Sequence, residues 1–266
     1  MADGILERIV ERVRLRLEET PPKPDLEVAA REAAERRRRE GLRSLQAVLV
    51  GLGPAVIAEC KRGSPSAGLL RSDFDPVELA RAYERGGAAA ISVVTEPDFF
   101  RGDPAWIRRV RAAVSLPVLR KDFIVTRRQV LESSVLGADA ILLIQRLLDP
   151  GDVMDLLITA HELDLEVLLE VFADENPAPA VASGARIVGV NARDLTTFET
   201  DLGAVEAAVE VIPTDRVRVA ESGIHSAGDV RRLHRAGYQA FLVGEHLVRA
   251  EQPEQALRSL LTPPSP

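Results

Sequence analysis

Charged side chains stand at the ends of five short apolar runs in this sequence of 266 residues. Along the chain these polar groups are Glu59-Cys60-Lys61, Arg120-Lys121-Asp122, Glu170, Asn191-Ala192-Arg193-Asp194 and Glu221-Ser222-Gly223. Burying a charge without a partner costs free energy, so the charged side chains must pair with one another or bind a charged ligand. A layer of ion pairs explains any one of them equally well. Five such groups together favour a reactive site.

The lysines and glutamates of this set can exchange protons at neutral pH. A lysine, with a reference pKa of about 10.4, is then in its acid form, and a glutamate, at about 4.3, is in its base form. No unusual tuning of either pKa is needed. We therefore predict an acid–base site that contains Lys61, Lys121, Glu59, Glu170 and Glu221.

Glycines after the last two apolar runs predict a phosphate site. They lie in Ser222-Gly223-Ile224 and in Gly244-Glu245-His246. In β/α barrels the loops after the last two strands commonly bind phosphate through backbone N–H groups, and glycine permits close approach. One glycine after a strand is more often a turn residue, so the prediction depends on the pair.

The remaining candidates for chemistry are weaker. No metal site is expected, because the histidines lack the spacing of metal ligands. They are His161, His225, His234 and His246. Cys60, the only cysteine, alternates with Glu59 and Lys61 in a strand, so it should face away from them and serve packing. Ser64 and Ser222 lack a visible His and Asp partner, which argues against a hydrolase triad.

The elements that must position these residues are eight short, β-branched runs separated by amphipathic stretches. The runs cover residues 56–59, 90–94, 118–121, 140–144, 167–171, 187–191, 217–220 and 240–243. They are too short for helices and are bracketed by Gly, Pro or Asp, which is typical of buried parallel strands in repeated βα units. We predict an α/β fold, a single (βα)8 TIM barrel whose carboxyl strand ends gather the polar groups.

A weak internal repeat supports the barrel. Gly87, Gly137, Gly184 and Gly237 each close a helical stretch just before an apolar run. They recur about every 50 residues, which fits two βα units per repeat with glycine at the left-handed end of a helix. An open, doubly wound sheet is the alternative, but it would normally carry a glycine-rich fingerprint after its first strand, and residues 61–65 do not match one.

The first 50 residues are expected to form a helical extension that packs on a barrel domain of residues 51–266. Apolar residues from Ile5 to Leu17 recur at helical spacing up to Pro21 and Pro22, and residues 25–50 resemble a second helical stretch. That stretch contains the basic run Arg36-Arg37-Arg38-Arg39, which glutamates flank, so we interpret it as a solvated helix face.

Composition excludes several classes of protein. Hydrophobic residues make up 46% of the chain, enough for a sizeable core, and the net charge of −7 opposes nucleic-acid binding. Charges break every apolar run near the N-terminus, so neither a signal peptide nor a membrane span is expected. A single cysteine allows no intramolecular disulfide. We expect a cytoplasmic protein, with no nucleic-acid or membrane partner, that acts as a monomer.

Six blocks of the sequence, in order, resemble the indole-3-glycerol phosphate synthase family of tryptophan biosynthesis. They cover residues 57–68, 92–96, 119–123, 170–171, 189–195 and 220–224. The resemblance implies a TIM barrel that converts 1-(2-carboxyphenylamino)-1-deoxyribulose 5-phosphate into indole-3-glycerol phosphate with loss of carbon dioxide and water. It also implies that no cofactor is needed, because the positive charge on the condensed ring accepts the electrons released by decarboxylation.

The resemblance further implies roles for the acid–base residues. Lys121 matches the general acid that protonates the ribulose carbonyl, and Glu170 matches the general base. Lys61 and Glu59 match positions that bind substrate and assist the proton transfers. The division of the acid roles between Lys61 and Lys121 stays open, with Lys121 ranked first.

The substrate itself is expected to contact three further groups of residues. Substrate-contacting positions are matched by Ser64, Asn191, Arg193 and Glu221. An apolar wall for the anthranilate ring would come from Phe100, Phe123 and Leu195. The phosphate would be held by Ser222, Gly223, Gly244 and Glu245. The family often has a serine at the position of Glu245, so only the backbone N–H of this glutamate is expected to help.

Two other functions would account for part of this sequence. Phosphoribosylanthranilate isomerase is a related barrel that uses a cysteine on strand one, which makes Cys60 relevant. It does not account for Lys121 or Glu170, and it tends to lack a long N-terminal extension. A barrel that has lost catalysis and only binds a phosphorylated metabolite or a protein would be expected to have lost one of these two residues first.

Overall fold

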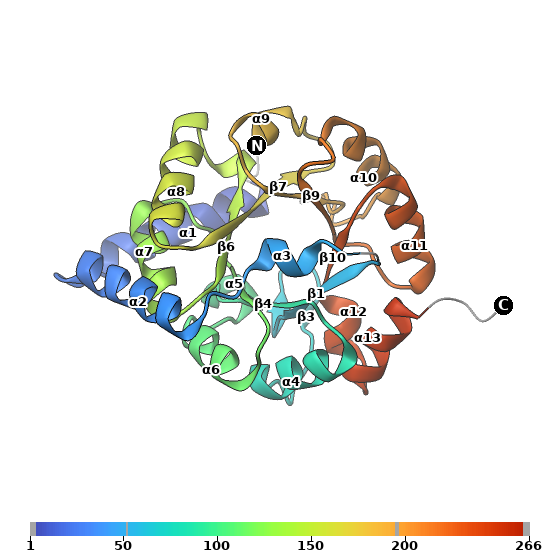
Figure 1. Ribbon diagram of the computed structural model, residues 1–266, viewed down its shortest axis with the longest axis horizontal. Helices are drawn as coiled ribbons and strands as arrows, with labels where there is room; N and C mark the ends of the chain where they lie inside the picture. The colour runs from blue at the N-terminus through green and yellow to red at the C-terminus, as the bar shows by residue number, and fades with distance from the viewer. Residues whose placement is uncertain (1–3, 52, 195–196, 263–266) are drawn as a thin grey trace.

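Eight parallel strands close into a barrel in the computed structural model, which describes residues 4–51, 53–194 and 197–262 (Figure 1). The strands are β1 Ala55–Cys60, β4 Ala90–Val94, β5 Val118–Lys121, β6 Ala140–Ile144, β7 Glu166–Phe172, β8 Ile187–Asn191, β9 Val217–Glu221 and β10 Ala240–Val243. Each strand pairs with its sequence neighbours in the barrel, and β1 pairs with β10 to complete it. The predicted TIM barrel is confirmed, and the open-sheet alternative is wrong.

The predicted strand positions agree closely with the observed ones. Strands β4, β5, β6, β8 and β10 have the expected bounds, whereas β1, β7 and β9 are longer by one residue at one or both ends. The extra residues include Glu166 and Glu221. Backbone pairing continues through these polar residues, and an apolar pattern cannot mark a strand end that carries a charge.

Helices surround the barrel on its outside. The longer ones are α4 Pro76–Gly86, α6 Ala105–Ala113, α7 Arg127–Leu136, α8 Pro150–Glu162, α10 Leu202–Ala208, α11 Ala227–Ala236 and α13 Pro253–Leu261. Shorter elements are the hairpin β2 Gly63–Ser64 with β3 Gly68–Leu69, the helices α5 Pro97–Phe100, α9 Ala178–Ala182 and α12 Glu245–Arg249, and the 3-10 turns η1 Gln145–Leu147 and η2 Val209–Val211. The four repeated glycines, Gly87, Gly137, Gly184 and Gly237, all have positive φ, as expected.

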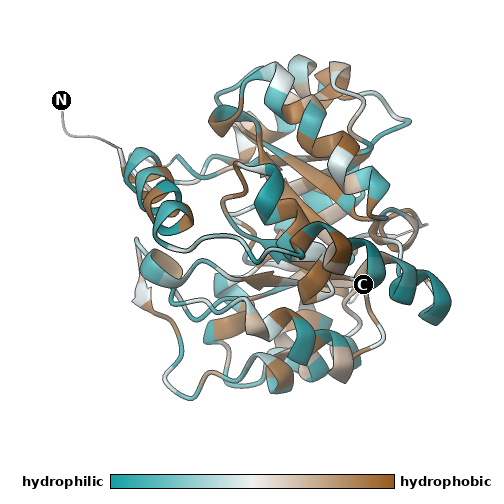
Figure 2. Cartoon of the chain, turned by 90° about the vertical axis from the view of Figure 1, so that its left-hand side faces the viewer, coloured by the Kyte–Doolittle hydropathy of each residue, from teal (hydrophilic) through white to brown (hydrophobic). Residues whose placement is uncertain are grey.

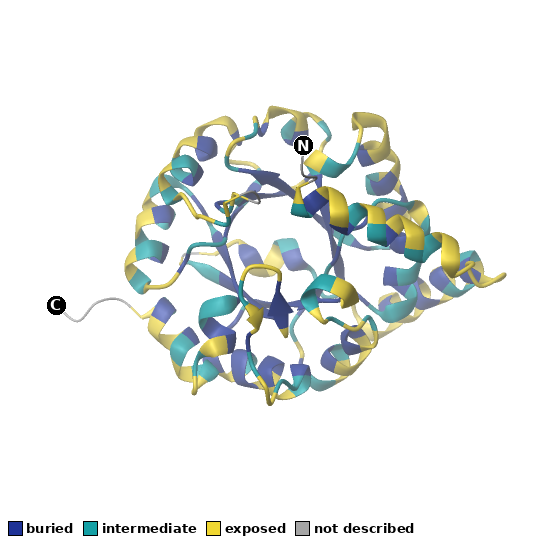
Figure 3. Cartoon of the chain, turned by 180° about the vertical axis from the view of Figure 1, so that it is seen from behind, coloured by how far each residue is buried: buried dark blue, intermediate teal, exposed yellow. Residues whose placement is uncertain are grey.

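Alternation along the strands creates two hydrophobic cores. In β1, Ile57 points into the barrel, whereas Val56, Ala58 and Cys60 point toward the helices. Figure 2 shows hydrophobic strands enclosed by helices with hydrophilic outer faces, and Figure 3 shows the same ring of strands as buried. Cys60 is buried in the outer core with its Sγ atom 3.6 Å from the Pro76 carbonyl, so its predicted orientation is confirmed.

The N-terminal segment forms three helices, α1 Ile5–Glu19, α2 Leu26–Glu40 and α3 Leu45–Leu49. The expectation of one helical stretch over residues 25–50 is therefore wrong: α2 ends at Glu40, and Gly41, with a φ of 95°, takes the chain out of the helix. Helix α3 lies across the amino-terminal end of the barrel (Figure 1). Leu45 and Leu49 complete the inner core there, and truncating either to alanine should cost about 2–5 kcal/mol.

The basic run in α2 is not wholly a solvated face. Arg37 is only 2% exposed, and its guanidinium donates to the carbonyls of Ser134 and Leu163, at 3.0 and 2.6 Å. The interpretation of this residue as solvated is wrong, because α2 packs against α7 and places Arg37 within reach of the Leu163 carbonyl, just after α8. No helix in the described part of the chain is long and apolar enough to cross a membrane.

Candidate active site

A cavity of about 150 Å³ opens at the carboxyl ends of the strands. Its walls contain the polar residues that end β1, β5, β7, β8 and β9, together with apolar residues of α1. Fourteen of the fifteen predicted site residues line it, namely Glu59, Lys61, Ser64, Phe100, Lys121, Phe123, Glu170, Asn191, Arg193, Glu221, Ser222, Gly223, Gly244 and Glu245. The fifteenth, Leu195, lies outside the described residues.

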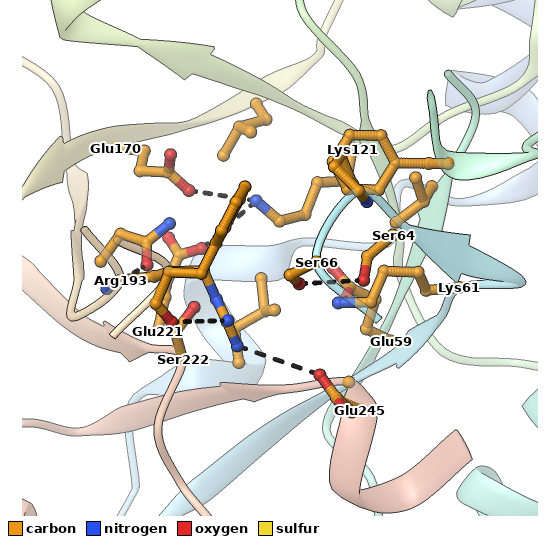
Figure 4. Close-up of a pocket in the computed structure, with 18 of the residues that line it drawn as sticks. Glu59, Lys61, Ser64, Ser66, Lys121, Glu170, Arg193, Glu221, Ser222 and Glu245 are labelled. Atoms are coloured by element: carbon orange, nitrogen blue, oxygen red, sulfur yellow. Dashed lines mark hydrogen bonds and ion pairs between the residues drawn. The ribbon is translucent and has the colours of Figure 1, made fainter. Parts of the chain in front are cut away.

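Lys121 is the centre of the acid–base group. As the last residue of β5, it extends from the barrel wall so that its Nζ atom lies 3.0 Å from Glu170 Oε2 and 3.4 Å from Glu221 Oε2 (Figure 4). The two glutamates are 2% and 1% exposed. Charge-assisted hydrogen bonds in such a water-poor space are strong and directional.

Glu59 and Lys61 form a second ion pair at the end of β1. Lys61 Nζ lies 2.8 Å from Glu59 Oε1, and Glu59 is 2% exposed. Burial by itself raises the pKa of Glu59, but the positive charges of Lys61 and Lys121 outweigh it, so the pKa falls below its ordinary value. Glu59 is therefore a buried carboxylate at neutral pH.

The pKa values of Lys121 and Glu221 are both raised, which favours the charged form of the lysine and the neutral form of the glutamate. Burial lowers the pKa of Lys121, but the carboxylates of Glu170, Glu221 and Glu59 outweigh burial and raise it above its ordinary value. The pKa of Glu221 is raised well above 4.5 by burial and by the neighbouring charge of Glu170, which exceed the opposing effect of Lys121. Lys121 therefore carries a positive charge next to Glu221, a glutamate that readily holds a proton.

Two glycines make room for the buried carboxylates. A Cβ atom at Gly189 on β8 would collide with Glu221 Oε1, and one at Gly244 would collide with Glu59 Oε1. Gly244 was predicted as a phosphate ligand, so this second use is additional. Gly189 was missed as a functional residue, and its only sequence signal is a glycine inside an otherwise β-branched strand.

The predicted phosphate loops meet on one side of the cavity. Ser222 and Gly223 both have positive φ, 66° and 70°, and a Cβ atom at Gly223 would lie only 3.1 Å from Thr200 and Leu202 side-chain atoms. A non-glycine residue with positive φ is uncommon, and such strain is often found at binding sites. This loop lines the cavity, and its backbone packs too closely against Thr200 and Leu202 to accept a side chain at Gly223 without strain.

Arg193 and Glu245 interact at the edge of the same loops. Arg193 Nη2 lies 4.0 Å from Glu245 Oε2, and Arg193 Nη1 donates to the Phe198 carbonyl at 3.1 Å. Glu245 is also paired with Arg249 one helical turn later, at 3.0 Å. The carboxylate of Glu245 is thus occupied by two arginines.

The apolar wall has more members than the sequence indicated. Phe100 and Phe123 contact each other with ring centroids 5.8 Å apart. Ile5, Leu6 and Ile9 of α1 also line the cavity. Their helical spacing was visible in the sequence, but the surface that this helix covers depends on how the chain folds back.

Several other polar residues lie near the cavity. Ser64 and Ser66 approach within 3.2 Å in the β2–β3 hairpin. His225 and His246 also line the cavity, and their rings contact edge to face at 6.2 Å. Sequence spacing alone did not connect them. Over residues 4–51, 53–194 and 197–262, no group of three or more His, Cys, Asp or Glu residues could hold a metal ion.

The sequence of this chain is similar to a known family of proteins. The family model described as "Indole-3-glycerol phosphate synthase" matches residues 6–260. The chain is 50% identical over 206 residues to the protein of that name from Rhodopirellula baltica, covering 77% of this chain and 80% of the relative. It is 44% identical over 257 residues to the one from Burkholderia multivorans, covering 95% and 97%.

Solved structures at lower identity share the fold. A tryptophan synthase α2β2 complex from Pyrococcus furiosus gives a TM-score of 0.58 at 14% identity, covering 78% of this chain and 97% of that chain. A 3-hexulose-6-phosphate synthase gives 0.63 at 15% identity, covering 77% and 97%. At this identity the likeness shows a common barrel and carries no argument about activity.

Proposed function

The chain belongs to the indole-3-glycerol phosphate synthase family, and from this premise we propose that Lys121 and Glu170 perform the acid–base chemistry of the reaction. The activity is that of a carboxy-lyase of tryptophan biosynthesis. It converts 1-(2-carboxyphenylamino)-1-deoxyribulose 5-phosphate into indole-3-glycerol phosphate, carbon dioxide and water. The observation that carries the proposal is the Lys121 ammonium, held 3.0 Å from Glu170 inside the cavity.

Lys121 is the acid of ring closure. When the aromatic carbon attacks the ribulose carbonyl carbon, the carbonyl oxygen gains negative charge, and Lys121 gives it a proton. Its raised pKa keeps it protonated before the reaction, and the neighbouring carboxylates hold the ammonium in one place. Carbon dioxide then leaves, and its bonding electrons neutralise the cationic ring.

Glu170 is the base of the dehydration. The hydroxyl formed in ring closure leaves as water when an acid protonates it, and Glu170 removes the ring proton whose electrons form the indole double bond. Its distance to Lys121 also allows a proton to pass between them and restore the starting state. Lys61 and Glu59, paired at 2.8 Å, bind the substrate and assist these transfers.

The substrate lies across the barrel mouth in this proposal. Its phosphate contacts Ser222, Gly223, Gly244 and the backbone N–H of Glu245, while Arg193 contacts an anionic group through its planar fork. On the opposite side, the anthranilate ring packs between the aromatic residues and α1. Asn191, Ser64 and Glu221 are available for its polar groups.

The alternative function, that of a phosphoribosylanthranilate isomerase, would need Cys60 in the active site. Cys60 lies in the outer core against Pro76 and does not line the cavity. Burial, together with the charges of Glu59 and Asp75, raises the pKa of its thiol far above the ordinary value. A cysteine in that position cannot exchange protons with a bound substrate.

Turnover tests the proposed function directly. Purified protein given the carboxyphenylamino-deoxyribulose phosphate should produce indole fluorescence without added nucleotide or metal. Lys121→Ala should lower kcat by at least about two orders of magnitude, because the developing oxyanion loses its proton donor. Binding of the product indole-3-glycerol phosphate should persist, because the phosphate loops are untouched. A near-normal rate in this variant would remove Lys121 from the acid's role.

A further inference from the structure

Both chain neighbours of Lys121 are charged, buried and paired with each other. Arg120 and Asp122 are each 4% exposed, and Arg120 Nη2 lies 2.8 Å from Asp122 Oδ2. Because side chains alternate along a strand, Arg120 points toward α7 while Lys121 points into the cavity, and Asp122, directly after the strand, pairs with Arg120. A buried ion pair of this kind is rarely worth more to stability than apolar packing, so its presence beside Lys121 calls for another explanation.

The end of β5 is held weakly by its own ladder. Lys121 has a register partner on β4, Val94, whereas pairing with β6 ends at Arg120. The last residue of the strand therefore has no partner on its β6 side. Without further contacts, the backbone that carries the Lys121 ammonium would be free to shift on that side.

Thr95, immediately after β4, contacts all three residues of this strand end. Its backbone N–H donates to the Lys121 carbonyl at 3.0 Å. Its hydroxyl donates to Asp122 Oδ2 at 2.6 Å and accepts from Arg120 Nε at 3.2 Å. Thr95 is fully buried, so these hydrogen bonds do not compete with water.

The same network reaches the aromatic wall. Arg120 Nη1 donates to Ser133 Oγ at 3.0 Å and to the Gln129 carbonyl at 3.2 Å, both on α7. The Gln129 side chain donates to the Phe123 carbonyl at 2.8 Å, and the Phe123 N–H donates to Asp122 Oδ1 at 2.9 Å. One set of hydrogen bonds therefore holds both the lysine and the neighbouring ring.

We propose that Thr95, Arg120 and Asp122 are positioning residues that hold the Lys121 ammonium where ring closure requires it. The inference rests on the acid role proposed for Lys121. The network lies behind the strand and does not line the cavity, except that Asp122 reaches its wall. Since β5 is opposite β9 in the barrel, loosening this network should disturb the acid and leave the phosphate loops in place.

A matched control lies at the other end of the same strand. Asp139, also 4% exposed, accepts from Arg111 Nε and Nη2 at 3.2 and 3.1 Å and from the Val118 backbone N–H at 3.0 Å. It is a buried aspartate in an arginine ion pair that holds β5, but it does so at the amino end, far from the cavity. Asp139→Asn should therefore affect stability alone.

The experiment compares Thr95→Val, Asp122→Asn and Asp139→Asn in the full chain. We expect kcat to fall about 10- to 100-fold in the first two, with KM and product binding close to wild type. The valine variant removes one hydroxyl from an otherwise similar shape and is the one least at risk of misfolding. Asp139→Asn should lower the thermal midpoint comparably while kcat stays near wild type.

The pH profile separates mispositioning from general damage. If Lys121 moves away from Glu170, Glu221 and Glu59, its pKa should fall toward the ordinary value, so the alkaline limb of the kcat profile should shift to lower pH. Normal kcat in both Thr95→Val and Asp122→Asn would overturn the inference, and so would an equal loss in Asp139→Asn. If Lys121→Ala were active, the proposed function would fail first, and the two failures are thus distinguishable.

Discussion

At the scale of single residues, two of the buried glutamates in the site, Glu59 and Glu221, have opposite electrostatic character. Glu59 faces Lys61 and Lys121 and stays ionised, whereas Glu221 adjoins Glu170 and readily holds a proton. The two residues have the same chemistry and nearly the same burial. Their difference comes from the balance at each site: two lysines outweigh burial at Glu59, whereas burial and Glu170 together outweigh Lys121 at Glu221. This balance allows the same fold to keep an acid and a base in one cavity.

This difference predicts opposite effects of one isosteric substitution. The pKa of Glu221 is higher in the folded than in the unfolded chain, so its contribution to stability is complete below 4.5 and is lost as pH rises above it. Glu221→Gln should therefore raise the thermal midpoint at pH 8 relative to wild type, with little difference at low pH.

Glu59→Gln is the matched comparison. The folded-state pKa of Glu59 is lowered, so its contribution is present above 4.5 and is lost as pH falls through the folded value. This variant should be less stable than wild type at pH 8, and the difference should shrink in acid. Thermal unfolding between pH 4 and pH 8 checks both; shifts of the same sign at pH 8 would contradict the charge assignment.

At the scale of elements, the strands determine how closely the reactive groups can approach. Strand β8 presents Gly189 to the barrel interior where Glu221 needs the space, and β10 is followed by Gly244 beneath Glu59. A side chain at either place would compete with a carboxylate for the same volume. The absence of a Cβ atom is therefore as much a part of the site as the charges are.

Gly189→Ala should show this directly. The new methyl group would displace the Glu221 carboxylate and lie 3.1 Å from Leu168 Cδ1, so we expect kcat to fall at least about tenfold and stability to fall by about 1–3 kcal/mol. Adding Glu221→Ala should remove most of the stability cost, because the colliding group is gone. Gly151→Ala, at an exposed position of helix α8 with nothing within 4 Å, should leave activity unchanged. Equal rates in both glycine variants would show that Glu221 can move freely.

At the scale of the whole molecule, the N-terminal segment contacts both ends of the barrel. Helix α3 contributes Leu45 and Leu49 to the inner core at the amino-terminal end, and α1 contributes to the cavity wall at the other end. We propose that residues 1–50 are an extension integrated with the barrel domain of residues 51–266. The charges that fix α1 include Arg16 with Glu96 at 3.2 Å, Arg16 with Asp98 at 2.6 Å and Arg12 with Asp98 at 3.3 Å.

Arg16→Met should weaken substrate binding. Glu96 is fully buried and also accepts the backbone N–H groups of α5, so Arg16 links α1 to the helix that carries Phe100. Losing a hydrogen bond to a buried charge should loosen α1 and raise KM about three- to tenfold, with a smaller change in kcat. Steady-state kinetics of this variant and of Arg14→Met, an exposed position on the same helix, provide the measurement. Equal KM values would mean that the remaining contacts of α1, among them the Arg12–Asp98 ion pair at 3.3 Å, hold the helix without Arg16.

The sequence by itself determined the barrel and the identity of most site residues. Strand positions follow from local signals, because short β-branched runs between glycines and prolines have few other stable conformations. The polar residues at strand ends could be listed for the same reason: in a parallel barrel every carboxyl end reaches the same mouth. The six blocks of residues then indicated the family.

Only the tertiary structure decided how these residues act on one another. Lys121 and Glu170 are 49 positions apart, and their 3.0 Å separation exists because β5 and β7 flank β6 in the barrel. The protonation of Glu221, the space left by Gly189 and the link through Thr95 likewise depend on contacts between distant strands. Such contacts depend on register and burial, which a linear pattern of residue types does not contain.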